Sequence, residues 1–335
     1  MSDPVIDPAR RLAPVIRLAP AKLNLTLAVV GRRSDGFHAL HSVFVPLALS
    51  DRLSLSPAAA ERDTLHVTGF PAGPPADNLV LRALAATRSA VSGGWPGGPG
   101  PTPALAARLE KLIPVAAGLA GGSSDAAAAM DAALEAWGAQ LAPDERLATA
   151  ARLGSDVPFF LTGGPALVEG RGEQVAPLHG LHGKPGVLLV TPAIAVSTRE
   201  VFDIYDGLRG RGNEATAMSS RHLAEELRSG LSGDDLVARA GALTVSNDLL
   251  QATLLLVPPL VPFRRALSRL LARPVGLSGS GPTLWALYAS EAEAAVAADA
   301  VRVALRDGRL STPGSASPFI TATAILHTSQ QGSRP

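Results

Sequence analysis

The segment with the clearest chemical potential is a glycine-rich run that leads into an apolar, helix-forming stretch. Glycines let backbone N–H groups approach a ligand closely, and the free N–H groups at a helix start favour a phosphate. Serine hydroxyls at the same point can add hydrogen bonds or contact a metal ion. The run therefore predicts a phosphate-binding loop. Its candidate residues are Pro114, Val115, Ala116, Ala117, Gly118, Leu119, Ala120, Gly121, Gly122, Ser123 and Ser124.

The same run also fits a structural role, in which the glycines form a tight turn and Ser123 or Ser124 caps the helix. It is not the lysine-containing phosphate loop of other nucleotide-binding proteins, because no Lys follows the last Gly. It is not a dinucleotide fingerprint either, because the glycine spacing differs and no clean βαβ unit surrounds it. The residues alone leave the binding and structural alternatives open.

Two charged residues in largely apolar surroundings are candidates for catalysis. Lys22 lies on the polar face of an alternating segment whose other face carries Leu23 and Leu25. Asp156 lies within the mostly apolar run 153–160. The structural alternatives are an exposed strand lysine and an aspartate that caps a turn. These alternatives also stay open at this level.

The composition describes a globular protein of two-domain size. The chain has 335 residues, 47% hydrophobic and 18% charged, with a net charge of +1, so charge gives no argument for nucleic acid or a membrane surface. It has no cysteine, which excludes disulfides, thiolate metal sites and cysteine nucleophiles. No apolar run is long enough to span a membrane, and the N-terminus lacks the apolar stretch of a signal peptide. We expect a cytoplasmic protein.

Hydrophobic periodicity places the glycine-rich run between a strand and a helix. Alternation predicts strands near residues 16–29, 43–49, 53–55, 65–67 and 104–112. Helical spacing or composition predicts helices at 78–91, 123–137 and 143–153. The Gly/Pro-rich stretch 92–103 predicts a surface loop, and 165–178 a hairpin that turns at Gly170.

The second half of the chain begins after 180–186, which we interpret as a domain junction. Its pattern predicts a strand at 187–191, several helices between 199 and 272, a strand–turn–strand around 279–282, a helix at 291–305 and a last strand at 319–327. Helices mixed with antiparallel-type strands predict the α+β class in both domains. The expected domains are 15–180 and 186–328, with flexible tails at 1–14 and 329–335.

Three motifs, in their order along the chain, resemble those of the GHMP kinases. They are Ala-Pro-Ala-Lys-Leu-Asn-Leu at 19–25, the glycine–serine loop at 118–127, and Gly-Leu-Ser-Gly-Ser-Gly-Pro-Thr at 276–283. The resemblance covers residues 16–328. It implies the two-domain GHMP kinase fold: an N-terminal mixed α/β ATP-binding domain with a left-handed crossover, a C-terminal ferredoxin-like α+β domain, and an active site in the cleft between them.

Within the GHMP kinases, the chain is most similar to the diphosphocytidyl-methylerythritol kinases. Arg-Ser-Asp-Gly-Phe-His at 33–38 is similar to their Arg-x-Asp-Gly-Tyr-His segment, and 153–160 to the segment with their catalytic Asp. Ser-Asn-Asp-Leu at 246–249 also looks like theirs. The resemblance implies ATP-dependent phosphorylation of the 2-hydroxyl of 4-diphosphocytidyl-2-C-methyl-D-erythritol, in non-mevalonate isoprenoid biosynthesis. It implies Mg²⁺ with the ATP, a partner with a cytidine diphosphate head, and neither nucleic acid nor membrane.

The resemblance assigns catalysis to Lys22 and Asp156. Asp156 would accept or orient the proton of the substrate hydroxyl, and Lys22 would keep Asp156 ionised and stabilise charge on the transferred group. Asn78 and Lys111 resemble positions that line the adenine pocket of the family. No metal ligand is assigned to a side chain.

The implied substrate site combines an aromatic ring, an imidazole and small polar groups. Phe37 would stack on the cytosine and His38 would hydrogen-bond its edge, or both belong to a packed turn. Asn24 and Thr198 would contact the substrate. Gly279 and Ser280 would close the floor of the site, or form an ordinary turn between strands.

The chain departs from the family pattern at two positions. Residue 37 is Phe where the family usually has Tyr, which preserves stacking but not a hydroxyl contact. Ala120 stands where the loop usually has Gly, and an alanine is strained there if the backbone requires a positive φ.

Three rival functions remain. The chain can be a homoserine or mevalonate kinase relative, against which residues 33–38 and 153–160 argue. It can be a catalytically inactive binding protein of the same fold, against which the retention of Lys22 and Asp156 argues. A nucleic-acid-binding role has little support, because the net charge is small and no basic strand carries several aromatic residues.

Overall fold

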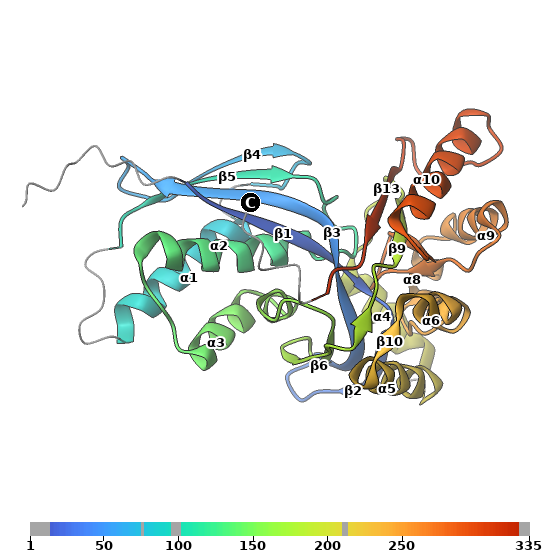
Figure 1. Cartoon of the computed structure of the whole chain (residues 1–335), viewed down its shortest axis with the longest axis horizontal. Coiled ribbons are helices and arrows are strands. Elements are labelled where there is room, and N and C mark those ends of the chain that lie inside the picture. The colour runs from blue at the N-terminus through green and yellow to red at the C-terminus, as the bar shows by residue number, and fades with distance from the viewer. Residues whose placement is uncertain (1–13, 75–76, 95–101, 210–213, 328–335) are drawn as a thin grey trace, which may run out of the picture.

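A computed structural model describes residues 14–74, 77–94, 102–209 and 214–327. The predicted tails therefore lie almost entirely outside the described residues, as does most of the predicted loop 92–103. Within the described part, seven strands form a larger sheet and four form a smaller one, which is the mixed α/β and α+β organisation predicted from the sequence (Figure 1).

The larger sheet is built around one long strand, because β3 pairs with strands on both of its edges. The strands are β1 (Val15–Asn24), β2 (Ala28–Arg32), β3 (His38–Pro57), β4 (Thr64–Gly69), β5 (Leu105–Lys111), β6 (Ala166–Gly170) and β7 (Gln174–Pro177). Helices α1 (Leu79–Gly94), α2 (Gly121–Trp137) and α3 (Pro143–Leu153) lie beneath this sheet in Figure 1, followed by the short 3₁₀ helix η2 (Pro158–Leu161). Apolar side chains of α1, α2 and the sheet form one buried cluster.

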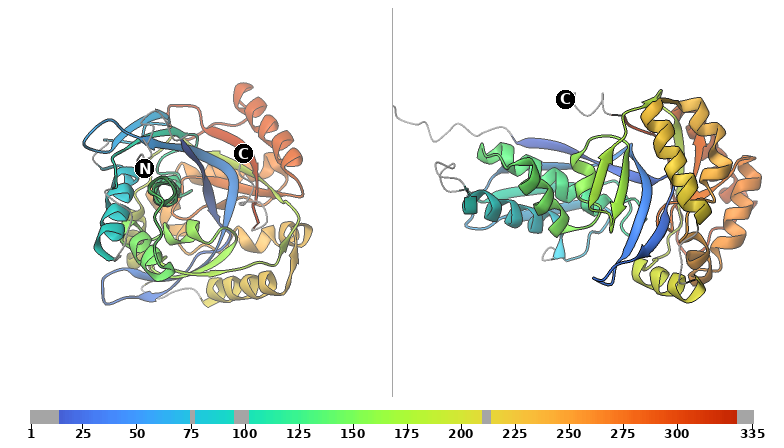
Figure 2. Two further views of the ribbon diagram at one scale, coloured as in Figure 1. Left: turned by 60° about the vertical axis from the view of Figure 1, so that its left-hand side comes forward. Right: turned by 90° about the horizontal axis from the view of Figure 1, so that it is seen from below.

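The second half is organised around a smaller antiparallel sheet with the order β11-β12-β9-β13. Its strands are β9 (Gly186–Thr191), β11 (Gly276–Leu277), β12 (Leu284–Tyr288) and β13 (Phe319–Ala324). The helices are α4 (Thr198–Arg209), α5 (Glu214–Ser229), α6 (Gly233–Ala238), α7 (Ala240–Leu243), α8 (Leu250–Leu256), α9 (Leu260–Leu271) and α10 (Glu291–Arg306). Figure 2 shows the helices of residues 79–153 and those of the second half at opposite ends of the molecule.

The two halves share a hydrophobic core. One buried cluster joins Leu23 and Val43 of the larger sheet to Leu189 and Trp285 of the smaller sheet, and to Leu227 of α5. We propose a domain boundary at 180–186, because β1 to β7 precede it and the smaller sheet follows it. That segment is itself structured, since β8 (Leu181–His182) pairs in parallel with β10 (Leu231–Ser232).

The structure corrects the predicted elements in three places. The single strand expected at 16–29 is divided into β1 and β2, because the chain changes partners: the Leu25 N–H donates to Val43 and the Leu27 N–H to Ser246. The two strands expected at 43–49 and 53–55 are one strand, β3, since its pairing continues through the polar residues between them. Helix α2 begins at Gly121, two residues before the predicted start.

Candidate active site

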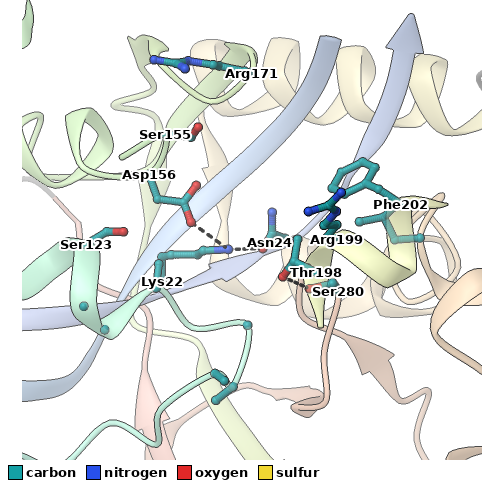
Figure 3. Close-up of a pocket in the computed structure, with 18 of the residues that line it drawn as sticks. Lys22, Asn24, Ser123, Ser155, Asp156, Arg171, Thr198, Arg199, Phe202 and Ser280 are labelled. Carbon is teal, nitrogen blue, oxygen red and sulfur yellow. Dashed lines mark hydrogen bonds and ion pairs between the residues drawn. The ribbon is translucent and has the colours of Figure 1, made fainter. Parts of the chain in front are cut away.

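A cleft of about 930 Å³ lies where the two halves meet. Its walls come from β1, the loop before α2, the loop before η2, the N-terminal part of α4 and the turn between β11 and β12 (Figure 3). All but two of the predicted site residues line it. The exceptions are Leu119 and Ser124, which are 1% exposed and absent from the lining.

Lys22 and Asp156 face each other across this cleft (Figure 3). The Lys22 Nζ lies 3.8 Å from the Asp156 Oδ2, although the two residues come from β1 and from the loop after α3. Asp156 is about one-third exposed, so its carboxylate can meet a ligand. The fold therefore brings together the two residues that the sequence predicts as catalytic.

The environment of Lys22 holds its ammonium group in one place. The Nζ donates to the Asn24 Oδ1 at 2.6 Å and lies 4.6 Å from the centre of the Phe44 ring. The backbone N–H of Lys22 donates to the Leu119 carbonyl at 3.0 Å, which ties β1 to the glycine loop. Burial lowers the pKa of Lys22, and the negative charge of Asp156 opposes that shift.

The glycine loop before α2 is held by the turn between β11 and β12. The Ser278 hydroxyl donates to the Gly118 carbonyl at 2.9 Å, and a Cβ built at Gly118 would collide with the Ser278 carbonyl oxygen. Gly118 also has φ 77°, a left-handed conformation that favours glycine. The two glycine motifs, 160 residues apart, thus form one surface.

Gly121, Gly122 and Ser123, in the first turn of α2, line the cleft, and the first N–H groups of a helix have no partner within it. The N-cap is Ala120, with φ 53° and ψ 31°, and no side chain caps the helix. Ser123 and Ser124 therefore lie within the first turn and are not caps. Ala120 occupies the left-handed region, as we expected if this position requires positive φ. Gly121 and Gly122 do not have positive φ.

Lys111 lines the cleft, but its ammonium group is bound by two buried carboxylates. The Nζ donates to Asp51 and, at 2.7 Å, to the Asp125 Oδ2. The other oxygen of Asp51 accepts the N–H groups of Leu112 and Ile113. Burial raises the pKa of Asp125 to about 7, partly offset by Lys111, while the Asp51 charge adds to the shift. This triad supports the base of the glycine loop, a role that the adenine-pocket prediction for Lys111 missed.

Asn78 lines the same end of the cleft and also starts α1. Its Oδ1 accepts the Val80 N–H at 2.9 Å, so it acts as a helix-capping side chain.

The other end of the cleft carries the predicted base-binding residues. The Phe37 side chain is exposed, and the Arg171 guanidinium lies 5.4 Å from its ring centre. His38 is more enclosed: its ring stacks on Phe202 at 4.6 Å, and its Nε2 lies 2.6 Å from the Asp206 Oδ1.

The remaining predicted contacts surround Lys22. The Asn24 Nδ2 donates to the Ser42 Oγ at 3.2 Å, which fixes the amide. The Thr198 and Ser280 hydroxyls lie 2.8 Å apart, which joins α4 to the β11–β12 turn. Gly279 has φ 58°, and a Cβ there would lie 3.3 Å from the Asn24 Oδ1.

Sequence reasoning missed several side chains that line the cleft. They are Phe44, Arg171, Arg199, Phe202 and Asp206. A signal for two of them was present, because Phe202 and Asp206 follow Thr198 at four-residue intervals and so share one face of a helix.

Comparison with known proteins agrees with this geometry. The GHMP kinase N-terminal domain model matches residues 78–164, and the GHMP kinase C-terminal model matches residues 225–307. A protein of Pelotomaculum thermopropionicum named 4-diphosphocytidyl-2-C-methyl-D-erythritol kinase is 40% identical over 280 residues, which cover 82% of this chain and 89% of that protein. One of the same name from Salinispora arenicola is 41% identical over 85% of both chains.

The chain belongs to the 4-diphosphocytidyl-2-C-methyl-D-erythritol kinase family of GHMP kinases. The crystal structure of a 4-(cytidine 5'-diphospho)-2C-methyl-D-erythritol kinase superposes with a TM-score of 0.66 and 31% identity, over 93% of this chain and 99% of that one. Homoserine kinase from Cytophaga hutchinsonii gives a TM-score of 0.65 at 17% identity, over 93% and 95% of the chains, and so shares the fold alone.

Two features are absent from the described residues of this member of the family. No group of three or more His, Cys, Asp and Glu side chains is placed to hold a metal ion. No helix in the described ranges is both long and apolar enough to cross a membrane.

Replacement of Lys111 tests the support beneath the loop. Lys111→Met leaves Asp51 and Asp125 buried without a cation, which should lower the free energy of unfolding by about 3–5 kcal/mol. The folded pKa of Asp125 lies above its unfolded value, so its ionisation destabilises the fold as the pH rises between about 4 and 7. The loss of unfolding free energy in Lys111→Met should therefore be smallest in acid and larger at pH 8. Urea unfolding at the two pH values measures it. The exposed Lys184→Met is the control, and an equal loss in both variants would contradict a supporting role.

Replacement of Ala120 tests the left-handed cap. Ala120→Gly removes the strain of a Cβ at φ 53° and should raise the free energy of unfolding by about 0.5–1 kcal/mol. The same change at an exposed position in the second turn of α10, Ala295→Gly, should lower it by about 1 kcal/mol. Thermal and urea unfolding measure both. Destabilisation of similar size in the two variants would show that Ala120 is not strained.

Proposed function

We propose that this chain transfers the γ-phosphoryl group of ATP to the 2-hydroxyl of 4-diphosphocytidyl-2-C-methyl-D-erythritol, giving the 2-phosphate and ADP. The observation that carries the proposal is the Lys22–Asp156 pair, 3.8 Å apart, in one cleft with the N-terminus of α2. Relatives about 40% identical over most of the chain carry the name of that kinase. The reaction belongs to isoprenoid precursor biosynthesis.

The phosphoryl donor occupies the end of the cleft formed by the glycine loop. The N–H groups at the start of α2 and the Ser123 hydroxyl face the phosphates, and Asn78 lies beside the adenosine. Mg²⁺ enters with ATP as part of the substrate, bound by triphosphate oxygens. We further propose that the reaction takes place in the cytoplasm, where ATP is available.

The acceptor hydroxyl lies against Asp156. Its oxygen forms the new bond to phosphorus while the bond from the γ-phosphorus to the β,γ-bridging oxygen breaks, and its proton passes to the Asp156 carboxylate. The Lys22 ammonium stabilises the negative charge on the transferred group. Arg199 lines the same cleft, is exposed and has no ion pair in the described part of the chain, so it is available to the diphosphate of the acceptor.

The cytosine lies at the aromatic end of the cleft. The exposed face of Phe37 offers a stacking surface, and His38 supplies a polar ring atom. The homoserine kinase alternative has less support, because that similarity extends to the fold alone. Purified protein with Mg·ATP and the cytidine substrate, followed by phosphorus NMR of the product, tests the activity. Turnover of homoserine or mevalonate in place of this substrate would refute it.

Replacement of the catalytic pair should affect the chemical step more than binding. Asp156→Asn and Lys22→Met should each lower kcat by about two orders of magnitude or more, with smaller changes in KM. In the double variant, the loss of kcat should be far smaller than the product of the two single losses. Removing the Asp156 charge also lowers the pKa of Lys22 further, so the alkaline fall of any residual activity should move to lower pH. Asp144→Asn, in an exposed turn of α3, is the control. Normal turnover by Asp156→Asn would remove this residue from the mechanism.

Replacement of Phe37 tests the stacking surface. Phe37→Ala should weaken binding of the acceptor by roughly 1–3 kcal/mol, the range for loss of one base–aromatic stack. Phe37→Tyr is the matched control and should be nearly neutral, because it keeps the ring. The KM for ATP should hardly change in either variant. Isothermal titration measures the two affinities, and an unaltered acceptor affinity in Phe37→Ala would place the base elsewhere.

A further inference from the structure

Helix α4 presents three side chains to the cleft at four-residue intervals, so they share one face. Thr198 contacts Ser280, and one turn later the Phe202 ring stacks on His38 with an interplanar angle of 17°. One further turn along, the Asp206 Oδ1 lies 2.6 Å from the His38 Nε2. The end of the acceptor site is thus built by α4 against β3.

The position of α4 is fixed by its other face. Val201 and Tyr205 are buried in a cluster with Leu249 and Ala252, and the Tyr205 ring also meets His38 edge-on at 6.1 Å. The imidazole is therefore held by two aromatic rings and a carboxylate, and its side chain is only 11% exposed. It has little freedom to turn.

The contact with Asp206 decides which nitrogen of His38 carries the proton. An ionised carboxylate only accepts hydrogen bonds, so the Nε2 must be the protonated nitrogen. In a neutral imidazole the other nitrogen, Nδ1, is then an acceptor. Among the residues that the structure describes, none forms a hydrogen bond with Nδ1. This atom is available to a ligand.

Arg32 supports the charge on Asp206. Its guanidinium lies 3.4 Å from the Asp206 Oδ2, the oxygen that does not contact His38. The Arg32 side chain is mostly exposed, so this contribution is screened by solvent. The buried part of the arrangement is the Asp206–His38 contact itself.

Cytosine and uracil differ at the group that would meet such an acceptor. Cytosine carries an exocyclic amine that donates hydrogen bonds, and uracil carries a carbonyl oxygen there, which only accepts. An unprotonated Nδ1 can accept a hydrogen bond from the cytosine amine. With uracil, two hydrogen-bond acceptors, Nδ1 and the carbonyl oxygen, would face each other without a proton between them. Leaving polar groups unpaired in this way is what makes a site selective.

We propose that Asp206 is a positioning residue for base selection: it holds His38 in the Nε2-protonated form, so that Nδ1 accepts from the amine of cytosine and disfavours uracil. The proposal deepens the function proposed above and rests on it, since it takes the acceptor to be a cytidine nucleotide. Asp206 acts through His38 and touches neither ATP nor the reacting hydroxyl.

The first test measures the imidazole without any catalysis. Long-range proton–nitrogen NMR correlation distinguishes protonated from unprotonated ring nitrogens, and the His38→Gln spectrum assigns the signals of this histidine. Wild-type protein at pH 8 should show a protonated Nε2 and an unprotonated Nδ1. Asp206→Ala should show a mixture of the two forms. A wild-type ring protonated at Nδ1 would overturn the proposal.

The second test compares the cytidine substrate with its uridine analogue. Asp206→Ala should raise the KM for the cytidine form roughly tenfold, reduce the preference for cytidine by about the same factor, and change kcat and the ATP KM little. The Asp206→Ala, His38→Ala double variant should resemble His38→Ala alone. Arg32→Ala should keep most of the preference. The proposal is wrong if Asp206→Ala keeps the wild-type preference for cytidine. It is also wrong if the double variant loses more of that preference than His38→Ala alone.

The two tests separate this proposal from the proposed function. If wild-type protein does not phosphorylate the cytidine substrate, the function fails, while the NMR spectrum still shows whether Asp206 sets the proton position. If Asp206→Ala unfolds, Asp206→Leu with a thermal melt provides a second variant, and the wild-type spectrum alone can still refute the idea.

Discussion

The structure depends on the contact between two glycine turns, one before α2 and one between β11 and β12. The Ser278 hydroxyl binds the Gly118 carbonyl, and the close approach leaves no room for a Cβ at Gly118. This contact sets the start of α2 beside Gly279 and Ser280 in the cleft, and the Leu119 carbonyl of the same loop accepts the backbone N–H of Lys22. Without it, the residues of the second half that line the cleft would not be held against the glycine loop of the first half.

Two buried lysines in this cleft are used in opposite ways. Lys111 lies between two buried carboxylates, so its charge is neutralised within the protein. The resulting ion pairs support the base of the glycine loop. Lys22 has one partly exposed carboxylate at 3.8 Å, a longer separation that leaves its ammonium able to meet a charge on a ligand. The difference lies in the number and burial of the partners, since both lysines are almost fully buried.

The same architecture serves kinases with unrelated acceptors, as the similarity to a homoserine kinase at 17% identity shows. What differs between such proteins must lie in the side chains that surround the acceptor. In the acceptor site proposed for this chain, those side chains come from the β2–β3 turn, the start of β3 and α4, and His38 of β3 stacks on Phe202 of α4. The proposed donor end consists largely of the glycine loop and the start of α2, where backbone N–H groups depend less on side-chain identity.

The sequence by itself determined the family and most of the elements, and it singled out Lys22 and Asp156, which the fold places 3.8 Å apart. Local patterns carry that information: period-two alternation around Lys22, a glycine run before an apolar helix, and Asp156 within an apolar segment. The strain at Ala120 could also be anticipated, because a position that favours glycine signals its backbone conformation in the sequence.

Only the tertiary structure decided which polar groups pair with which. The partners of Lys111 are 60 and 14 residues away, and Asp206 is 168 residues from His38, so no local spacing could reveal either set. The division of the first strand also depended on a remote partner, since Leu27 pairs with the segment around Ser246. Sequence periodicity reports which face of an element is buried, whereas hydrogen-bond partners depend on how distant elements pack.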